Sequence, residues 1–382
     1  MILSKEDKGY RQCSISVMDN IADPAISFDE KGICNYYYEY LKREKEAVHK
    51  GEEGEKKLAE LVAAIKEAGK GKKYDCITGV SGGVDSTYLS LQAKKLGLNP
   101  LIIHFDNGWN SELAVKNIEE IIGRLNFDLY TLVVNWEEFK DIQLSFIKAS
   151  VVDIETVTDH AIFATLYKLA VEHNIKYILS GTNVVTEATL PPYWIYRKSD
   201  HINIIDIHKK FGTVPIKTYP LFTTRLKKTV QMKGIKSVDP LNYMPYIKAD
   251  VKRVIAEELG WKDYGGKHYE SIFTRFYQGY ILPTKFGIDK RKAHLSNLIF
   301  SGQISKEQAV KELAEPIYNP EQLKIDKEFV LKKLDLSETA FDDLMKQPRK
   351  EHTEYDFEKP LATRYPVLKP ISYMYRKIIK VK

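Results

Sequence analysis

Residues 74–86 read Tyr-Asp-Cys-Ile-Thr-Gly-Val-Ser-Gly-Gly-Val-Asp-Ser. The first seven are mostly apolar and indicate a buried strand, and the segment that follows Ser86 has helical spacing. Two adjacent glycines between a strand and a helix let the backbone approach a ligand, present successive N–H groups and use the positive end of the helix dipole. This stretch therefore predicts a phosphate-binding loop; the structural alternative is a glycine turn in which Asp85 or Ser86 caps the helix.

The composition of this loop restricts what it would bind. Ser81 and Ser86 offer hydroxyl donors, and Asp85 is compatible with phosphate only if a magnesium ion lies between them. A Walker loop would require a lysine at its end, and a dinucleotide fingerprint would require G-x-G-x-x-G; neither is present here. The expected phosphate contacts are Ser81, Gly82, Gly83, Val84, Asp85 and Ser86.

The chain around this loop alternates short β-branched runs with segments of helical period, which predicts an α/β fold. A doubly wound, mainly parallel, Rossmann-like sheet follows, with ligands at the carboxyl ends of its strands. The expected strands are 74–80, 101–105, 129–134 and 177–180, and the expected helices between them are 85–96, 111–125 and 157–173.

Composition shifts divide the chain into three expected parts. A small N-terminal segment, 1–70, contains an amphipathic helix in which Leu58, Leu61, Val62 and Ile65 share one face. Residues 71–245 form the nucleotide domain, and 246–382 form a mainly helical substrate or partner region, with helices expected at 248–259 and 305–313. The segment beyond Thr186 is rich in proline and aromatic residues and is interpreted as a lid or binding surface.

Overall composition favours a soluble cytoplasmic protein that does not bind nucleic acid. The 382 residues carry a net charge of +6 with both signs evenly mixed. Three scattered cysteines fit a reducing compartment. No apolar run approaches the roughly 20 residues that span a bilayer, and the N-terminus lacks the features of a signal peptide. The basic segment 360–382 is interpreted as a solvated tail, with an attachment surface as the alternative.

At the loop and at two later strand ends, the sequence resembles the PP-loop ATP pyrophosphatases, whose sheet is of the PP-loop/HUP type. In that superfamily the loop holds the β,γ-pyrophosphate of ATP, and cleavage gives AMP. The resemblance implies an adenosine pocket at His104 and Asp106, ATP contacts at Gly181 and Thr182, and a magnesium ion held by Asp85 and Glu187.

A narrower resemblance covers nearly the whole chain and concerns the N-acetyl sugar amidotransferases of the WbpG/PseA type. These bacterial enzymes convert the acetamido group of a nucleotide-linked sugar into an acetamidino group. The segments that carry it are Val17-Met-Asp19, Asp23-Pro24, Phe28-Asp29, Gly32, His104-Phe-Asp-Asn-Gly-Trp-Asn-Ser-Glu112, Val134-Asn-Trp-Glu-Glu138, Asp159-His160-Ala161, Pro240-Leu-Asn-Tyr243, His268-Tyr-Glu-Ser271, Phe273-Thr-Arg-Phe-Tyr277 and Asp289-Lys-Arg291.

This resemblance implies an AMP-forming, ligase-type enzyme that uses ATP and Mg²⁺ on a UDP-linked N-acetyl sugar in lipopolysaccharide O-antigen synthesis. An amide oxygen is a poor leaving group, so adenylation must precede its replacement by ammonia. The expected catalytic residues are Asp85, Ser86 and Asp159, and the expected substrate contacts are Lys267, His268, Arg275 and Arg291. Asp159 could instead be a charge favoured by a helix N-terminus, and His160 a satisfied core histidine.

Two cysteine patterns complete these expectations. Ile2 follows Met1 and Cys76 lies within a strand, so no glutaminase is predicted in this chain, and a separate glutaminase/cyclase-like pair is the expected ammonia source. The family's paired C-x-x-C motifs are reduced here to Cys13 and Cys34, so no zinc is expected. The alternatives are a tRNA-modifying PP-loop enzyme and an ATP-binding module without turnover.

Overall fold

The structure is a computed structural model and describes residues 9–266 and 269–359. Its centre is a five-stranded sheet in which all neighbouring strands run parallel, in the order β3-β2-β1-β4-β5. The strands are β1 (Cys76–Gly79), β2 (Pro100–Asp106), β3 (Leu129–Val133), β4 (Tyr177–Leu179) and β5 (Lys236–Val238). The predicted doubly wound parallel sheet is confirmed, because the chain moves outward from β1 to β3 and then crosses back to β4 and β5.

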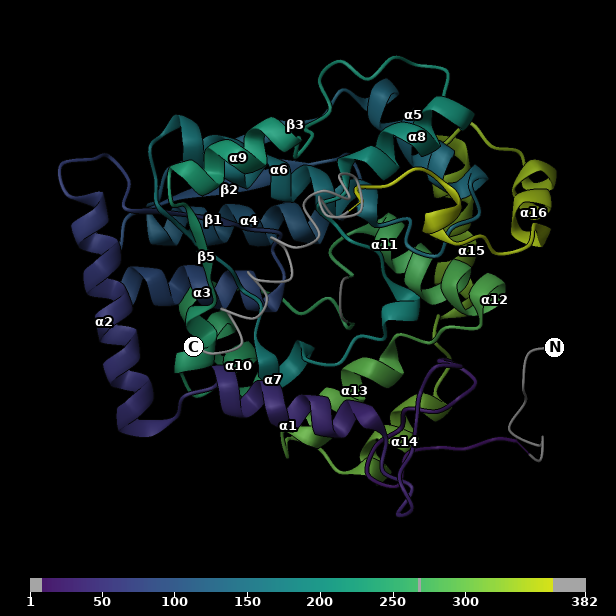
Figure 1. Cartoon of the computed structure of the whole chain (residues 1–382), viewed down its shortest axis with the longest axis horizontal. Coiled ribbons are helices and arrows are strands. Elements are labelled where there is room, and N and C mark those ends of the chain that lie inside the picture. Colours follow the sequence, from purple (N-terminus) through teal and green to yellow (C-terminus); the bar gives the residue numbers. More distant parts are fainter. Residues whose placement is uncertain (1–8, 267–268, 360–382) are drawn as a thin grey trace, which may run out of the picture.

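Helices cover both faces of this sheet and continue into a C-terminal helical region (Figure 1). They are α1 (Asn35–Ala47), α2 (Gly51–Gly69), α3 (Val84–Lys95), α4 (Glu112–Leu125), α5 (Trp136–Lys148), α6 (Thr156–Glu172), α7 (Val184–Glu187), α8 (His201–Phe211), α9 (Thr224–Met232), α10 (Lys248–Leu259), α11 (Ile272–Phe276), α12 (Leu282–Phe286), α13 (Arg291–Phe300), α14 (Lys306–Ala314), α15 (Pro320–Lys333) and α16 (Glu338–Lys346). Short helical turns are η1 (Pro192–Trp194), η2 (Pro240–Tyr243), η3 (Tyr277–Ile281) and η4 (His352–Glu354).

Successive side chains of β2 point to opposite faces of the sheet, as in any pleated strand. Ile102 packs with Ile118 and Ile121 of α4, whereas Leu101 and Ile103 pack toward α6 and α9 on the opposite face. Each β-α-β connection therefore buries one row of branched side chains beneath a helix. The buried rows fix the sheet register and bring the carboxyl ends of the strands to one edge.

The observed helices agree closely with those expected around the sheet. Helix α10 has the predicted bounds, and α3, α4 and α6 each begin or end within one residue of them. Helix α14 has the predicted capping box between Ser305 and Gln308. Strand β5 was not predicted, because its three residues are polar or only partly buried.

The largest cluster of buried apolar side chains draws on all three expected segments of the chain. It joins Met18 near the N-terminus, Trp109 beside the sheet and Phe341 in α16. The segment from Glu270 pairs with the loop after β2, because Ser111 N donates to Glu270 O at 2.9 Å and Asn110 forms a bridge with Ser271. The C-terminal region therefore packs directly against the carboxyl edge of the sheet. The proposed division at residues 70 and 245 stays a prediction.

Candidate active site

The Ser81–Ser86 loop lies where the strand order reverses. It follows β1, and the chain after β4 lies beside it, so the two loops flank the crevice that open α/β sheets use for ligands. A Cβ on Gly181 would lie 3.3 Å from both the Asp85 carbonyl carbon and the Ser86 nitrogen. This close approach allows almost no side chain at residue 181. The structure thus brings together the two predicted ATP-contacting segments.

The loop backbone is held from outside by two aromatic side chains of the C-terminal region. Trp261 Nε1 donates to Gly82 O at 2.7 Å, and Tyr264 OH donates to the same oxygen at 3.0 Å. Gly82 has φ +81°, and a Cβ there would lie 2.7 Å from the Tyr264 hydroxyl. Glycine is therefore required by conformation and by space, while the carbonyl points away from a phosphate site toward its two donors.

The two serine hydroxyls of the loop lie close to each other. Ser81 Oγ and Ser86 Oγ lie 3.4 Å apart, and Gly83 N donates to Ser81 Oγ at 3.3 Å. Helix α3 begins at Val84, with Gly83 as its N-cap residue and no side chain capping it. Hydroxyl groups and the first amides of a 12-residue helix therefore meet at one point, which is the arrangement that an anionic phosphate requires.

Carboxylates gather beside the loop at the ends of β1, β4 and β5. Asp85 Oδ1 accepts a hydrogen bond from Tyr246 OH and one from Asn183 Nδ2 at 3.3 Å. Burial, the charge of Asp85 and the charge of Glu187 all raise the pKa of Tyr246, so both carboxylates act on this hydroxyl. Burial also raises the pKa of Asp239, and the charge of Glu187 adds to that effect.

This donor set fits a magnesium ion. Mg²⁺ binds through one or two carboxylates together with substrate phosphates and waters, and Asp85 and Glu187 are oxygen donors at the side of a phosphate cradle. Asp239, at the end of β5, is influenced by the charge of Glu187, but no three such side chains in the described part of the chain are arranged to hold a metal, so phosphates and waters would have to supply the other ligands. Burial is the main cause of both raised pKa values, and a cation would offset the smaller contribution from the Asp85 and Glu187 charges.

The predicted adenosine residues close the second strand. His104 is 8% exposed; its Nδ1 lies 3.3 Å from Val80 O, and its Nε2 lies 3.2 Å from Asn110 Nδ2. Asp106 Oδ1 accepts from Gly108 N at 2.9 Å. These contacts tie β2 to β1 and shape the turn beyond it. A contact of either side chain with adenosine stays a prediction.

The first turn of α6 carries a cluster of opposite charges. Lys198 Nζ lies 2.7 Å from Asp153 Oδ2 and 3.0 Å from Asp159 Oδ2, and Lys290 Nζ lies 3.1 Å from Glu155 Oε2. Asn107 Nδ2, just after β2, donates to Thr158 Oγ1 at 3.2 Å. That bond places this turn at the carboxyl edge of the sheet, on the same edge as the phosphate loop.

His160 is a satisfied core histidine. It is fully buried, its Nδ1 lies 2.6 Å from Lys198 O, and its Nε2 accepts from Phe222 N at 3.0 Å. One ring nitrogen must therefore donate while the other accepts, which requires the neutral ring. Burial lowers the pKa of His160 to about 4.

Of the four predicted substrate contacts, the structure describes the two arginines. Arg275 directs its guanidinium to Asp326, with Nε–Oδ2 2.6 Å and Nη2–Oδ1 2.9 Å. Arg291 pairs with Asp289 and donates to backbone carbonyls at the end of α14. Both arginines thus have ion partners within the protein, and their role toward a substrate stays a prediction. Lys267 and His268 lie outside the described residues, as does the basic segment 360–382.

The cysteines of the N-terminal segment lie together although the zinc motif is incomplete. Cys34 N donates to Cys13 Sγ at 3.3 Å. Ser16, which stands where the first C-x-x-C motif would have its second cysteine, has its Oγ 4.0 Å from Cys34 Sγ. Within residues 9–266 and 269–359, no group of three His, Cys, Asp or Glu side chains is arranged to hold a metal. The absence of zinc stays a prediction.

Several residues of this site were not singled out by their own sequence signal. Tyr246, Trp261 and Tyr264 reach the loop from 161 to 182 residues along the chain. Glu270 places Oε1 3.2 Å from the position of a Cβ on Gly83. Of these, only Glu270 falls within a motif that marked the family resemblance.

Comparison with known proteins supports the C-terminal part of this resemblance directly. Residues 270–369 match the family described as "LPS biosynthesis protein WbpG-like, C-terminal domain". The C-terminal part of the chain is thus similar to the C-terminal domain of WbpG-like proteins. A curated relative, the uncharacterized protein MJ1599 of Methanocaldococcus jannaschii, is 26% identical over 315 residues, which cover 80% of this chain and 94% of the relative.

Solved structures resemble this chain more distantly. An NMN synthetase from Francisella tularensis is 15% identical with a TM-score of 0.39, covering 74% of this chain and 97% of that one. An NH3-dependent NAD synthetase from Campylobacter jejuni is 13% identical with a TM-score of 0.29, covering 78% and 98%. Similarity at these values assigns no activity. Among the described helices, none has the length and apolarity that a membrane crossing requires.

Proposed function

We propose that this WbpG-like protein is an ATP-dependent, AMP-forming amidotransferase that converts an acetamido group of a UDP-linked N-acetyl sugar into an acetamidino group. The observation that carries the proposal is the Ser81–Ser86 loop at the switch point of the sheet, joined to a C-terminal domain of the WbpG type. That family's description names lipopolysaccharide biosynthesis, which supports a bacterial surface polysaccharide as the destination of the product.

The first step joins the sugar to AMP. The acetamido oxygen attacks the α-phosphorus of ATP, the bond to the β-phosphate oxygen breaks, and pyrophosphate leaves. Ser81, Ser86 and the first amides of α3 are placed to bind the departing phosphates, as preorganised donors do in phosphoryl transfers. Magnesium, when bound, would neutralise phosphate charge, and Asp85 and Glu187 are the side chains that would hold it.

The second step replaces oxygen by nitrogen. Ammonia adds to the adenylated carbon, one proton is lost from the added nitrogen, and the carbon–oxygen bond breaks to release AMP and the amidine. Asp159 is the proposed proton acceptor, because it lies on the sheet's carboxyl edge and its side chain is 47% exposed. Partial burial raises the pKa of Asp159, and the charges of Glu155 and Asp153 add to this while Lys198 opposes it; the net upward shift strengthens Asp159 as a base.

The ammonia is proposed to come from a separate glutaminase. Cys76, the cysteine that precedes the phosphate loop, is buried, and burial raises its pKa well above its usual value. A buried, protonated thiol is a poor nucleophile for glutamine hydrolysis. Free ammonium is therefore expected to support turnover of the purified chain.

A panel experiment tests this function. The purified chain is incubated with ATP, Mg²⁺, ¹⁵N-ammonium and a series of UDP-acetamido and diacetamido sugars and uronates. We expect AMP to form together with a sugar product in which one oxygen is replaced by ¹⁵NH. AMP formation that requires tRNA instead, or tight ATP binding without AMP, would support the tRNA-modifying or the non-catalytic alternative.

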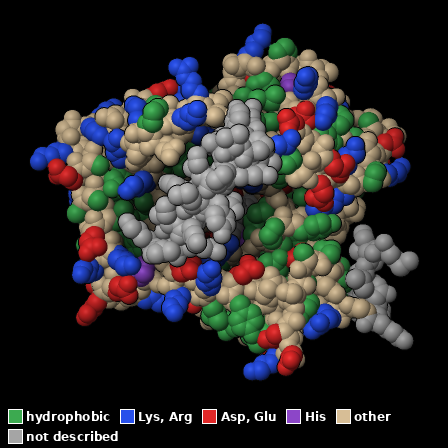
Figure 2. All heavy atoms as spheres, in the orientation of Figure 1, with side chains coloured by type: hydrophobic (Ala, Val, Ile, Leu, Met, Phe, Trp, Pro, Cys, Tyr) green, Lys and Arg blue, Asp and Glu red, His purple; other side chains and the backbone are tan. Residues whose placement is uncertain are grey.

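The distribution of charge on the surface gives a further reason to favour a sugar nucleotide over a nucleic acid as the substrate. Figure 2 shows the Lys and Arg side chains of the described residues interspersed with Asp and Glu on that face, rather than gathered in a single stripe. Nucleic-acid-binding surfaces usually concentrate positive charge on one face. The net charge of +6 over 382 residues agrees with the mixed distribution.

A further inference from the structure

Lys198 lies in the proline- and aromatic-rich segment between η1 and α8 and connects two carboxylates. Its Nζ lies 2.8 and 2.7 Å from the two oxygens of Asp153 and 3.0 Å from Asp159 Oδ2. The contacts with Asp153 are hydrogen bonds, and the contact with Asp159 is an ion pair. The side chain is therefore committed to the two aspartates.

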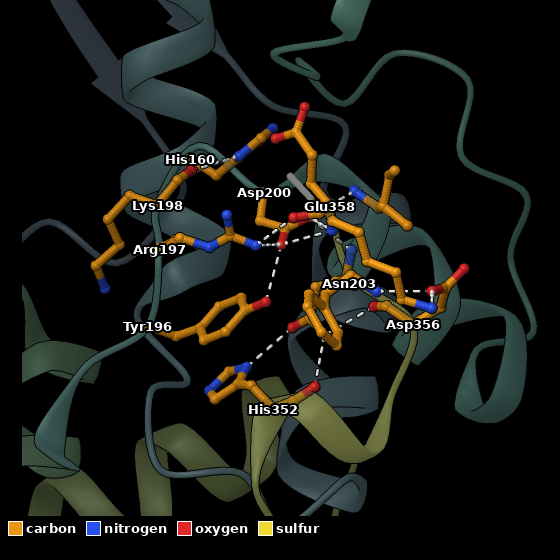
Figure 3. A network of polar contacts seen from close by, with 12 residues as sticks. His160, Tyr196, Arg197, Lys198, Asp200, Asn203, His352, Asp356 and Glu358 are labelled. Atoms are coloured by element: carbon orange, nitrogen blue, oxygen red, sulfur yellow. Dashed lines mark hydrogen bonds and ion pairs between the residues drawn. The ribbon is translucent and has the colours of Figure 1, made fainter. Parts of the chain in front are cut away.

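The backbone of Lys198 is fixed by the same turn of α6 that receives its side chain. His160 Nδ1 lies 2.6 Å from Lys198 O, so consecutive residues of α6, Asp159 and His160, hold the two ends of one lysine. Figure 3 shows the Lys198 side chain extending away from Asp200 and Asn203. Tyr196 N also donates to Asp153 Oδ2 at 2.7 Å, which fixes the anchor from the same segment.

The two aspartates differ in their access to solvent. Asp153 is 1% exposed, whereas the Asp159 side chain is 47% exposed. A ligand at the carboxyl edge would therefore meet Asp159, and Asp153 serves as the buried counter-charge that keeps Lys198 in place. Lys198 in turn limits the orientations available to the Asp159 carboxylate.

We propose that Lys198 is a positioning residue that, anchored on Asp153, orients Asp159 to receive the proton from the nitrogen that adds to the adenylated acetamido carbon. This inference rests on the proposed function. One N–H bond breaks, the proton moves to the open oxygen of Asp159, and the electron pair stays on the nitrogen as AMP leaves with the bond pair of the C–O bond. The proton then passes to solvent.

Other charged and titratable groups also face this carboxylate. Partial burial raises the pKa of Asp159, Lys198 lowers it, and Glu155 and Asp153 raise it, while Lys290 is paired with Glu155. The charge of Asp159 also acts on the Tyr219 and Tyr277 hydroxyls, which donate to Val157 O and Val152 O, and burial raises the pKa of both far above the range of the reaction. Removal of the Lys198 charge would therefore raise the pKa of Asp159 further and leave its orientation less restricted.

The test compares Lys198→Met with Lys198→Arg across pH at constant free ammonia. For Lys198→Met we expect kcat to fall by about 10- to 100-fold, as misplacement of a reacting group does, with the KM for ATP unchanged. The acid limb of the kcat profile should move to higher pH, and Lys198→Arg should restore part of both. Lys140→Met, which breaks a comparable ion pair on α5, is the matched control and should keep the wild-type profile.

A titration without turnover separates this inference from the proposed function. ¹³C NMR of labelled aspartate carboxylates, with Asp159→Asn to assign the signal, reports the pKa of Asp159 directly. A higher pKa in Lys198→Met supports the inference, and an unchanged pKa or an unchanged acid limb overturns it. If Lys198→Met does not fold, Lys198→Gln, which removes the charge and keeps an N–H donor, must show the same shifts. A wild-type protein without turnover on any sugar refutes the proposed function, and the catalytic inference with it.

Discussion

At the scale of single residues, Asp85 has two functions that can be separated. Its carboxylate accepts from Tyr246 and Asn183, which orients it, and its charge is required beside a phosphate site only if a cation is bound. An amide in its place keeps an acceptor oxygen for Tyr246 and removes the charge. The substitution therefore distinguishes a cation ligand from a structural cap of α3.

For Asp85→Asn we predict loss of AMP formation by about 100-fold or more, the order found when an electrostatic contact to a transition state is removed. The thermal unfolding midpoint should stay close to that of the wild type. Asp128→Asn, on the exposed side of the sheet where Asp128 pairs with Lys73 at 2.8 Å, is the control and should retain full activity. Normal AMP production by Asp85→Asn would refute the assignment of this loop.

At the scale of elements, the contact between the C-terminal region and the phosphate loop is the part of the site most open to test. Trp261 and Tyr264 both donate to Gly82 O, and Trp261 is 4% exposed. Their hydrogen bonds satisfy the Gly82 carbonyl and restrain the backbone of the loop. Loss of one donor should allow the loop to adopt other conformations when ATP is absent.

For Trp261→Phe we predict that the KM for ATP rises by about 2- to 10-fold, which corresponds to a net hydrogen bond of about 0.5–1.5 kcal/mol. Steady-state kinetics with ATP as the varied substrate measures it. Trp194 is a matched control: its indole also donates to a backbone carbonyl, Ala22 O at 2.7 Å, and is fully buried. Trp194→Phe should lower stability by a similar amount without changing the KM; equal KM values in both variants would contradict a role for the contact.

The elements around the loop could be predicted because their signals are local. Strand β1, the glycine pair and α3 are consecutive, and the branched residues of β2 and the period of α6 need no information from elsewhere in the chain. Strand β5 has only Lys-Ser-Val and is paired on one side by β4, so its pairing, rather than its composition, makes it a strand. The sheet was therefore predictable from local sequence, whereas its edge strand β5 was not.

The residues of the site that were not predicted were missed for the same reason: their contacts are not local in the sequence. Tyr246 reaches Asp85 across 161 residues, and Trp261 reaches Gly82 across 179. An aromatic residue at either position is equally compatible with an ordinary core residue, and only the folded chain shows which carbonyl or carboxylate it faces. The same limit applies to Lys198, whose two carboxylate partners lie on another segment of the chain.

At the scale of the whole molecule, two buried histidines join distant segments around the α6 turn. His352 Nε2 accepts from Asp153 N at 3.4 Å, its Nδ1 lies 2.9 Å from Asn203 Oδ1, and its ring stacks on Tyr196 at 4.3 Å (Figure 3). Asn203 Nδ2 also donates to His352 O at 2.8 Å. Through His352, the last described segment of the chain is attached to α8 and to the loop before α6.

Protonation of these histidines opposes folding. A second ring proton on His352 would face the Asp153 N–H, and one on His160 would face the Phe222 N–H, so two donors would meet in each case. Burial accordingly lowers the pKa of each to about 4 from the 6.5 of an exposed histidine. Between these values the unfolded chain binds more protons than the folded one, so stability is fully present above pH 6.5 and falls as the pH drops toward 4.

We therefore predict that the free energy of unfolding falls between pH 6.5 and 4 by up to about 1.4 kcal/mol per pH unit for each histidine. Urea denaturation at a series of pH values measures this slope. Carboxylates with lowered pKa values, such as Asp141, take up protons only at the acid end of that range and below it, because their unfolded pKa is near 4.

His352→Asn keeps a donor toward Asn203 without a titratable ring and should remove about one proton from the slope. The control is His173→Asn, at an exposed position, which should leave the slope as in the wild type. A wild-type slope in His352→Asn would mean that His352 is already protonated in the folded protein, which the contact with the Asp153 N–H opposes.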